Sequence, residues 1–313
     1  MQLKVTRIQS EAHNIKSFEL RQPDGAALPA FTAGSHVHVN VINPNGKADT
    51  RQYSLLSDPA DTSRYEIAVL LETAGRGGSE YMHTKVAEGS MLEVSQPTNE
   101  FPLSATGDHA ILIAGGIGIT PLLSMVHALN AAGRSYELHY AARTPKHMAY
   151  QSVIEAAAGS RAKFYFTSTL TRMDVGHLLG TPKAGTHIYF CGPNRLIDQV
   201  KGTAQAKGWK PDQIHFESFG ARWETADQPV EVTLSMSGLT FMVQPGQTIL
   251  EAIEASGAWS PWECRRGECG TCATVYTAGT PVHRDSCLTP ADHKHTICTC
   301  VSWANGGKLV LDL

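Results

Sequence analysis

The sequence lacks an excess of charge of either sign, because its 313 residues contain 26 Lys and Arg against 29 Asp and Glu. Proteins that bind nucleic acid or anionic membranes carry a basic surplus or patch, so we expect neither kind of partner. Walker and G-x-S-x-G motifs are absent, and the 14 histidines show no H-E-x-x-H or H-x3-H metal spacing. We therefore expect four paired histidines to lie at the surface or in local hydrogen bonds: His36, His38, His293 and His295.

A long, uninterrupted hydrophobic run is missing as well. The first residues, MQLKVTRIQSEAHN, contain no apolar core followed by a small-residue cleavage site. Residues 109–133 are uncharged and long enough for a membrane span, but Gly115, Gly118 and Pro121 interrupt their centre. A buried strand, a tight turn and a helix ending on Gly133 explain this stretch better. We expect a cytoplasmic protein.

The pattern of short hydrophobic segments divides the chain into three predicted domains. Residues 1–104 contain short strands separated by turn signals, with one helix near 79–85, which favours an antiparallel β-barrel. Residues 105–222 alternate strands with helices, which favours a parallel α/β sheet. After a polar linker at 221–228, residues 229–313 combine a hairpin, a short helix, a Cys-rich loop and a closing strand at 308–313. The predicted fold class is therefore multidomain.

The seven cysteines carry the sharpest signal. Their odd number argues against a secreted disulfide framework. Three of them have the C-x4-C-x2-C spacing of plant-type [2Fe–2S] proteins: Cys264, Cys269 and Cys272. Gly267 and Gly270 allow this loop to fold tightly, so that backbone N–H groups point at the sulfurs.

The fourth ligand of such a cluster has to come from a distant cysteine. The candidates are Cys287, Cys298 and Cys300. A structural zinc site is the alternative, with Cys269 and Cys272 paired with Cys298 and Cys300, but it would leave Cys264 unused. Ordinary buried thiols are a further alternative.

A possible flavin motif lies in the first domain, where Arg51, Gln52, Tyr53 and Ser54 fall in a predicted strand. Arg pairs with phosphate as a fork, Tyr covers a flavin ring and Ser reaches its N5 edge. The segment 75–79, GRGGS, precedes a short helix and exposes consecutive N–H groups to an anion. The alternatives are an exposed strand and a flexible turn.

Two strand ends in the second domain suit a dinucleotide. The segment 113–121, IAGGIGITP, follows a strand and opens a helix, with Thr120 expected as the N-cap and Pro121 as the first helical residue. Its glycines, Gly115, Gly116 and Gly118, would let the backbone approach a pyrophosphate. The G-x-G-x-x-G fingerprint fails because its sixth position holds Pro121. The second strand end is formed by Cys191, Gly192 and Pro193. A tight turn and a buried thiol are the alternatives.

The Cys-rich loop and the ending CVSWANGGKLVLDL resemble the phthalate dioxygenase reductase family, and the resemblance covers nearly the whole chain from RQYSL onward. These are FMN- and [2Fe–2S]-containing reductase components of Rieske oxygenases, including vanillate O-demethylase reductases. The resemblance implies an FMN-binding β-barrel at 1–104, an NAD-binding α/β domain at 105–222 and a β-grasp ferredoxin domain at 229–313. It implies Cys300, which opens the C-V-S motif, as the fourth ligand, and leaves Cys287 and Cys298 as free thiols.

The resemblance also implies roles for individual residues. The FMN phosphate would meet Arg51 and the turn residues Gly77, Gly78 and Ser79. The ring would lie along Tyr53, Ser54 and the strand residues Ala68, Val69 and Leu70, flanked by Thr120 and Phe219. Leu70 departs from the family, in which a basic residue can stand at this position. If the site needs a basic charge there, Arg76 would supply it. Cys191 would lie near the nicotinamide C4, and Phe219 would occupy the nicotinamide's place and move aside, so that the predicted catalytic residues are Ser54, Cys191 and Phe219.

The predicted nucleotide is NADH, because the family is mostly NADH-linked. Arg143, Lys146 and His147 follow the second strand of the α/β domain, where a 2′-phosphate would need cations, and Arg143 is included among the cofactor-binding residues.

The three predicted sites form an ordered electron path. A nicotinamide gives two electrons as hydride and a [2Fe–2S] cluster takes one at a time, so a flavin, which handles both, belongs between them. We therefore expect electrons to pass from NADH through FMN and the cluster to an external acceptor, and the resemblance implies that this acceptor is a Rieske-type terminal oxygenase of aromatic degradation. Plant-type clusters lie near about −400 mV and Rieske centres at roughly −150 to +300 mV, so the transfer is downhill. The alternatives are a reductase for another oxygenase class and a non-catalytic iron–sulfur redox sensor.

Overall fold

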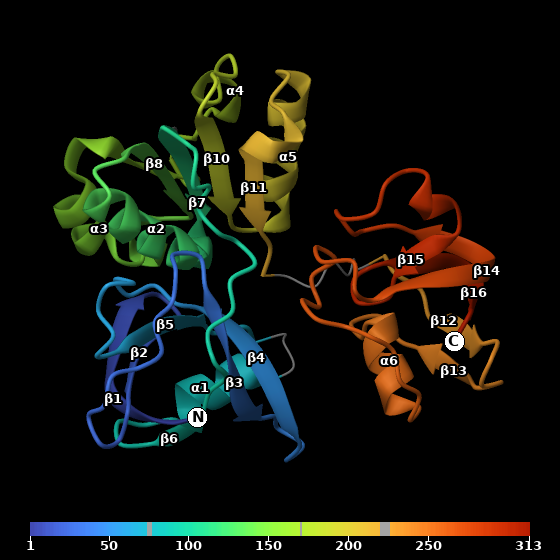
Figure 1. Ribbon diagram of the computed structural model, residues 1–313. Coiled ribbons are helices and arrows are strands. Elements are labelled where there is room, and N and C mark those ends of the chain that lie inside the picture. The colour runs from blue at the N-terminus through green and yellow to red at the C-terminus, as the bar shows by residue number, and fades with distance from the viewer. Residues whose placement is uncertain (74–76, 170, 220–225) are drawn as a thin grey trace. The chain divides into compact units, whose positions relative to one another are not determined.

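The computed structural model describes residues 1–73, 77–169, 171–219 and 226–313 (Figure 1). The chain divides into two compact units, Met1–Ser218 and Phe219–Leu313, and each is described by itself. None of the helices in the described ranges is long and apolar enough to cross a membrane.

The first unit begins with a strongly curled antiparallel half-barrel, which confirms the predicted barrel. Its elements are β1 (Gln2–Ala12), β2 (Ile15–Arg21), β3 (His36–Ile42), β4 (Ala48–Ser54), β5 (Tyr65–Leu70), α1 (Gly78–Thr84) and β6 (Met91–Glu93). Four strands pair in the order β5-β2-β1-β6, and β3 pairs with β4. Isolated bridges from His36 to Thr98 and from Val39 to Val94 join β3 to the chain beyond β6. Alternate β3 residues, Val37, Val39 and Val41, are buried in the core, as a strand with one inward face requires.

The second part of this unit is the predicted parallel sheet. Its strands are β7 (His109–Gly115), β8 (Ser135–Ala142), β9 (Ala162–Phe166), β10 (Thr186–Cys191) and β11 (Ile214–Glu217), in the order β11-β10-β7-β8-β9. Its helices are α2 (Ile119–Ala131), α3 (Gln151–Ala158), α4 (Val175–Leu178) and α5 (Asn194–Ala206). Two separate hydrophobic cores form, one containing residues of α2 and α3 and the other residues of α4 and α5. The strand order reverses between β7 and β10, which is where ligands bind in sheets of this kind.

The start of α2 differs from the prediction. The N-cap is Gly118 rather than Thr120, because a 3₁₀ turn at Gly116–Gly118 winds the chain before the α-helix begins at Ile119. The hydroxyl of Thr120 instead donates to the carbonyl of Ile117 at 3.0 Å. The predicted helix end is confirmed, since Gly133 has φ +62° and its N–H donates to the carbonyl of Asn130 at 3.1 Å.

The second unit has the predicted β-grasp fold. Its elements are β12 (Val230–Leu234), β13 (Thr240–Val243), α6 (Ile249–Ala255), β14 (Ala273–Val282), β15 (Thr296–Cys298) and β16 (Trp303–Leu311), with strand order β13-β12-β16-β14-β15. Thr248 caps α6 by accepting the N–H of Glu251 at 3.1 Å, while the Glu251 carboxylate accepts the N–H of Thr248. The closing strand begins at Trp303, earlier than predicted, and β15 was not predicted.

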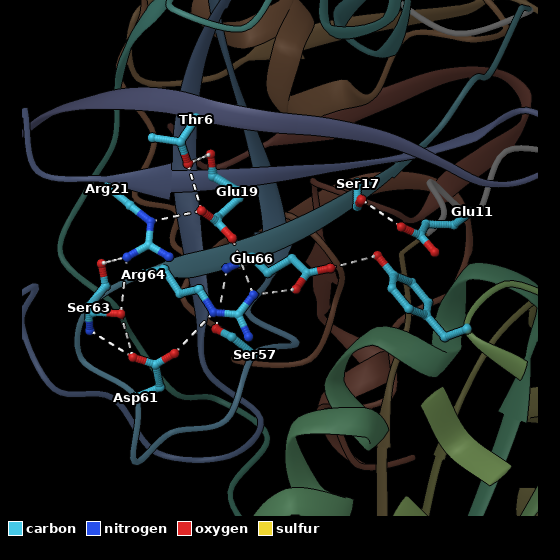
Figure 2. A network of polar contacts seen from close by, with 11 residues as sticks. Thr6, Glu11, Ser17, Glu19, Arg21, Ser57, Asp61, Ser63, Arg64 and Glu66 are labelled. Carbon is cyan, nitrogen blue, oxygen red and sulfur yellow. Dashed lines mark hydrogen bonds and ion pairs between the residues drawn. The ribbon is translucent and has the colours of Figure 1, made fainter. Parts of the chain in front are cut away.

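A network of charged side chains lies over β2 and β5 of the half-barrel (Figure 2). Arg64 donates to Asp61 at 3.0 Å, to Glu19 at 3.3 Å and to Glu66 at 3.4 Å. Hydrogen bonds from Ser63 and then Arg64 lower the pKa of Asp61 to about 2. The hydroxyl of Tyr150, from the parallel-sheet part, donates to Glu66 at 3.4 Å, so the network reaches both parts of the first unit.

Candidate functional site

The Arg51 guanidinium lies against the glycines that open α1. A Cβ placed on Gly78 would be 2.5 Å from Nε of Arg51, so only glycine permits this approach. Gly77 has φ +82°, which favours glycine as well. Nη1 of Arg51 pairs with Asp49 at 2.7 Å, whereas Nη2 is buried and has no hydrogen-bond partner among the described residues. A buried guanidinium nitrogen beside main-chain N–H groups suits a phosphate oxygen.

Ser79, the last residue of the predicted phosphate turn, contacts the segment that follows β5. The hydroxyl of Ser79 accepts the N–H of Glu72 at 3.0 Å, which fixes the start of the segment after β5. Ala68 and Val69 are buried and Leu70 is half-buried on that strand. The predicted residues Gly75 and Arg76 lie outside the described residues.

Tyr53 and Ser54 are the last two residues of β4, and Ser54 contacts the parallel sheet. Ser54 is 4 % exposed, and its Oγ donates to Oε2 of Glu217 at 3.3 Å. Glu217 is 1 % exposed at the end of β11, so two residues 163 positions apart join the half-barrel to the carboxyl edge of the sheet. Burial raises the pKa of Tyr53 well above its ordinary value, so the phenol stays neutral.

Gln52 faces a pair of histidines from β3. Its Nε2 lies 2.8 Å from Nε2 of His38 and 3.2 Å from Nε2 of His36, and the two rings stack at 5.4 Å. His36 also contacts the Thr98 hydroxyl at 3.0 Å. The predicted local hydrogen bonding is therefore confirmed. Of the two predicted alternatives, hydrogen bonding holds for His36, which is 1 % exposed and bridges to Thr98 in the chain beyond β6.

The two predicted nucleotide motifs meet at the point where the strand order reverses. A Cβ on Gly118 would lie 2.3 Å from the carbonyl oxygen of Cys191, and one on Gly192 would lie 3.0 Å from Cα of Gly115. The two backbones therefore touch, with Cys191 and Thr120 both buried at this edge. The exposed loop residue Arg143 follows β8 at the same edge of the sheet.

Some neighbours of this edge were not singled out from the sequence. Asn194, at the start of α5, accepts the Ser218 hydroxyl at 3.1 Å, next to Pro193. The sequence signal that could have identified Asn194 is its position directly after C-G-P, at the start of a helix. Phe219 is 40 % exposed and begins the second unit, so its predicted place against the flavin stays a prediction.

The Cys-rich loop of the second unit gathers sulfur atoms. Cys264 accepts the N–H of Arg266 at 3.3 Å and that of Cys269 at 3.5 Å, as expected of a loop that points its N–H groups at sulfur. The sulfurs of Cys272 and Cys300 are 3.1 Å apart. Gly267 and Gly270 have φ +71° and +78°, the left-handed conformation that such tight wrapping requires.

Two further cysteines lie beside this set. Cys287 and Cys298 have their sulfurs 3.6 Å apart, and neither is in a disulfide. Hydrogen bonding with Cys298 and Cys300 lowers the pKa of Cys272, which favours its thiolate form. A buried thiolate among further thiols is the donor chemistry of an iron–sulfur or zinc centre.

Behind the loop lies a charged cluster that the sequence did not reveal. Arg284 pairs with Asp227 through both of its terminal nitrogens, one bond measuring 2.7 Å, and both side chains are buried. The buried Asp285 carboxylate contacts the ring of His293 at 3.1 Å, which confirms local hydrogen bonding for that histidine. His283 stacks on His293 at 3.9 Å. Asp227 falls in the predicted linker, whose residues 221–225 lie outside the described ranges.

Three known families match successive parts of the chain. Residues 2–102 match the oxidoreductase FAD-binding domain. Residues 94–214 match the N-terminal domain of dimethylamine monooxygenase subunit DmmA-like proteins. Residues 232–304, which include every cysteine from Cys264 to Cys300, match the 2Fe-2S iron-sulfur cluster binding domain.

Similar proteins also extend over the whole chain. The chain is 41 % identical over 288 residues to the heme-dependent oxidative N-demethylase beta subunit of Ectopseudomonas mendocina, covering 92 % of this chain and 91 % of that protein. It is 38 % identical to phthalate dioxygenase reductase of Burkholderia cepacia, covering 100 % and 97 %. A solved phthalate dioxygenase reductase, described as a modular structure for electron transfer from pyridine nucleotides to [2Fe-2S], matches with TM-score 0.81 and 38 % identity over 100 % of this chain and 98 % of that one.

Proposed function

We propose that this chain, which belongs to the phthalate dioxygenase reductase family, is the reductase subunit of an oxygenase system and transfers electrons from a reduced pyridine nucleotide through a flavin to a [2Fe–2S] centre. The observation that carries the proposal is the gathering of cysteine sulfurs around Cys272 in the second unit. In the first unit, Nη2 of Arg51 is buried and has no hydrogen-bond partner among the described residues, which adds support for an anionic ligand there. When bound, a flavin accepts two electrons together and releases them singly to a one-electron centre. The domains proposed are 1–104, 105–222 and 229–313.

The proposed flavin is FMN. Arg51 Nη2 and the N–H groups of Gly77, Gly78 and Ser79 would hold its phosphate. The residues present fit, because Nη2 is buried and no described residue is its hydrogen-bond partner. The family model that matches residues 2–102 is named for FAD. The choice of FMN rests instead on the resemblance to the reductase family, whose members with a C-terminal ferredoxin domain carry FMN. Acid extraction and chromatography of the released flavin decide between the two, and recovery of FAD would overturn the choice.

At the junction of the two parts of the first unit, Ser54 would hydrogen-bond the flavin edge. The buried Ser54 hydroxyl supports this role. It donates a hydrogen bond to Oε2 of Glu217 at 3.3 Å, so that the lone pairs of Oγ can accept a hydrogen bond from the flavin edge. Cys191 would line the nicotinamide site, and Phe219 would cover the flavin until the nucleotide binds. The contact between Gly118 and Cys191 supports this arrangement, because it brings both strand ends to one place.

The proposed nucleotide is NADH. Its pyrophosphate would lie along Gly115, Gly116 and Gly118 at the start of α2, next to Gly192 and Pro193. The exposed Arg143 would approach the ribose end, because it follows β8 on the same edge. The ratio of kcat/KM for NADH to that for NADPH tests the choice, and a ratio below one would contradict it.

The proposed cluster ligands are Cys264, Cys269, Cys272 and Cys300. Cys264 already receives two backbone N–H groups, and Cys300 lies 3.1 Å from Cys272, so these sulfurs suit a pair of irons. Cys298 also contacts Cys272, and the choice of Cys300 over it rests on the C-V-S motif.

The proposed partner is a Rieske-type oxygenase. A haem-dependent oxygenase is the second candidate, because the relative at 41 % identity is a subunit of a heme-dependent oxidative N-demethylase and residues 94–214 match a dimethylamine monooxygenase subunit family. Purified oxygenases of both classes, each offered to the NADH-reduced protein, separate the two by which one turns over its substrate.

One experiment tests the reductase function itself. Holoprotein mixed with NADH without oxygen should lose its flavin absorbance and then give the paramagnetic signal of a reduced iron–sulfur centre, and it should reduce ferricyanide continuously. A non-catalytic sensor would show no sustained turnover. Holoprotein that contains flavin, iron and sulfide but does not react with NADH or NADPH would refute the proposal.

A further inference from the structure

The proposed ligand set leaves two cysteines of the second unit unassigned, and they touch each other. The sulfurs of Cys287 and Cys298 are 3.6 Å apart. A disulfide is about 2.05 Å long, so the two sulfurs need to approach by about 1.6 Å to form one. Cys287 is partly exposed in the loop after β14, whereas Cys298 is fully buried at the end of β15. An accessible thiol in contact with a buried one is the arrangement of an oxidisable thiol and its resolving thiol.

A metal ion is the other use for such a pair, and the surroundings disfavour it. The Asp285 carboxylate lies within 4.8 Å of both sulfurs. Its oxygens already accept the Leu288 N–H at 3.0 Å and contact the His293 ring at 3.1 Å. Structural metal sites in proteins use about four ligands, and with the Asp285 oxygens already engaged the two sulfurs alone fall short of that number.

We propose that Cys287 and Cys298 form a peroxide-sensitive dithiol site beside the iron–sulfur ligand set. The Cys287 thiolate attacks the O–O bond of hydrogen peroxide, which forms a sulfenic acid and releases hydroxide. Cys298 then attacks that sulfur, so that the S–S bond forms as the S–O bond breaks and a second hydroxide leaves. The two thiol protons convert both hydroxides to water. Two thiols are thus oxidised by two electrons, and one peroxide is reduced to two waters.

The dithiol site rests on the proposed function through one assignment, that Cys300 rather than Cys298 is the ligand. It also has a consequence for electron output. Cys298 packs in one buried cluster with Cys272 and Cys300, and a disulfide removes its S–H from beside these proposed ligand sulfurs. Hydrogen bonding around ligand sulfurs is one of the factors that set cluster potential, and losing a donor there disfavours the more negative reduced state. Oxidation should therefore slow reduction of a one-electron acceptor while NADH still reduces the flavin at the same rate.

The experiment uses the holoprotein, treated with one equivalent of hydrogen peroxide, then unfolded in an alkylating reagent and mapped by mass spectrometry without reductant. We expect a linked peptide pair containing Cys287 and Cys298 that dithiothreitol separates, with iron content unchanged. Cytochrome c reduction should fall at least twofold and recover with dithiothreitol. Absence of the linked pair, or peroxide inhibition that persists unchanged in Cys287→Ser, would overturn the proposal.

Matched variants distinguish a failure of the dithiol site from a failure of the proposed reductase function. Cys287→Ser should retain the cluster and resist peroxide, because no linked pair can form. Met236→Leu, which removes an exposed sulfur of the second unit outside the proposed sites, should leave the peroxide response intact. Loss of iron in Cys298→Ser would remove the basis of the dithiol site while NADH-dependent flavin reduction continued. Failure of the reductase function would instead abolish the reaction with NADH in every variant.

Discussion

Replacing Arg51 with Ala should weaken FMN binding by a predictable amount. Nη1 of Arg51 is engaged by Asp49 and by the Thr50 carbonyl, at 2.7 and 2.9 Å. Nη2 is buried and without a partner among the described residues, so we count one new charge-assisted hydrogen bond to phosphate. Such a bond contributes about 1.5–3 kcal/mol. At about 1.4 kcal/mol per decade, the Kd for FMN should rise roughly 10- to 150-fold.

The assay is a titration of flavin-free protein, monitored by quenching of flavin fluorescence. Riboflavin, which lacks the phosphate, provides the internal control, because Arg51→Ala should leave its Kd almost unchanged. Arg51→Lys keeps the charge but loses the planar fork, so it should fall between the wild type and Arg51→Ala. The visible absorbance of the iron–sulfur centre should be the same in all three proteins.

Two results would refute this reasoning. An unchanged Kd for FMN would mean that Arg51 does not meet the phosphate. An equal loss of FMN and riboflavin affinity would mean that the substitution acts by disturbing α1, where the guanidinium packs against Gly78, rather than through charge.

The other predictions concern the cluster ligands, the stability of the second unit and the loss of stability of the first unit in acid. Cys300→Ser should lose iron and sulfide on purification whereas Cys298→Ser should retain both, and the reverse pattern in iron analysis would show that the ligand choice is wrong. Arg284→Ala should lower the free energy of unfolding by about 3–5 kcal/mol in urea, because it leaves the Asp227 charge buried, and a loss below 1 kcal/mol would contradict that. Asp61 has a folded pKa of about 2, below its ordinary 3.8, so its contribution is present above pH 4 and is lost as the pH falls toward 2. Asp61→Asn should therefore have a lower free energy of unfolding than the wild type at pH 6. Between pH 4 and pH 2 it should lose less of that free energy than the wild type does. Parallel curves of unfolding free energy against pH for the two proteins would contradict the prediction.

Local patterns predicted much of the fold because their causes are local. Alternation over 36–42 placed β3, and a glycine after a helical pattern placed the end of α2 at Gly133. The C-x4-C-x2-C spacing fixed which cysteines share one loop, since chain length alone limits how far they separate. Thr120 shows the limit of such rules, because a 3₁₀ turn before the helix moved the N-cap to Gly118.

Contacts between distant segments could not be predicted in this way. Ser54 and Glu217 are 163 residues apart, and Asp227 and Arg284 are 57 apart, so no periodicity connects either pair. Asp227 looked like part of a polar linker because a buried acidic residue is recognisable only beside its partner. Strand β15 was missed because three residues are too few to show an alternating pattern.

The geometry of Cys264 separates the two metal hypotheses that the sequence left open. A zinc site built from two pairs of cysteines would leave Cys264 without a role. The loop instead buries this sulfur and directs two backbone N–H groups at it, from Arg266 and Cys269. Burial raises the pKa of Cys264, and the backbone donors aimed at its sulfur act in the opposite direction, as hydrogen bonds to a ligand thiolate would. The left-handed Gly267 belongs to the same tight loop. These contacts favour a centre that uses Cys264, and the match of residues 232–304 to the 2Fe-2S iron-sulfur cluster binding domain agrees with that chemistry.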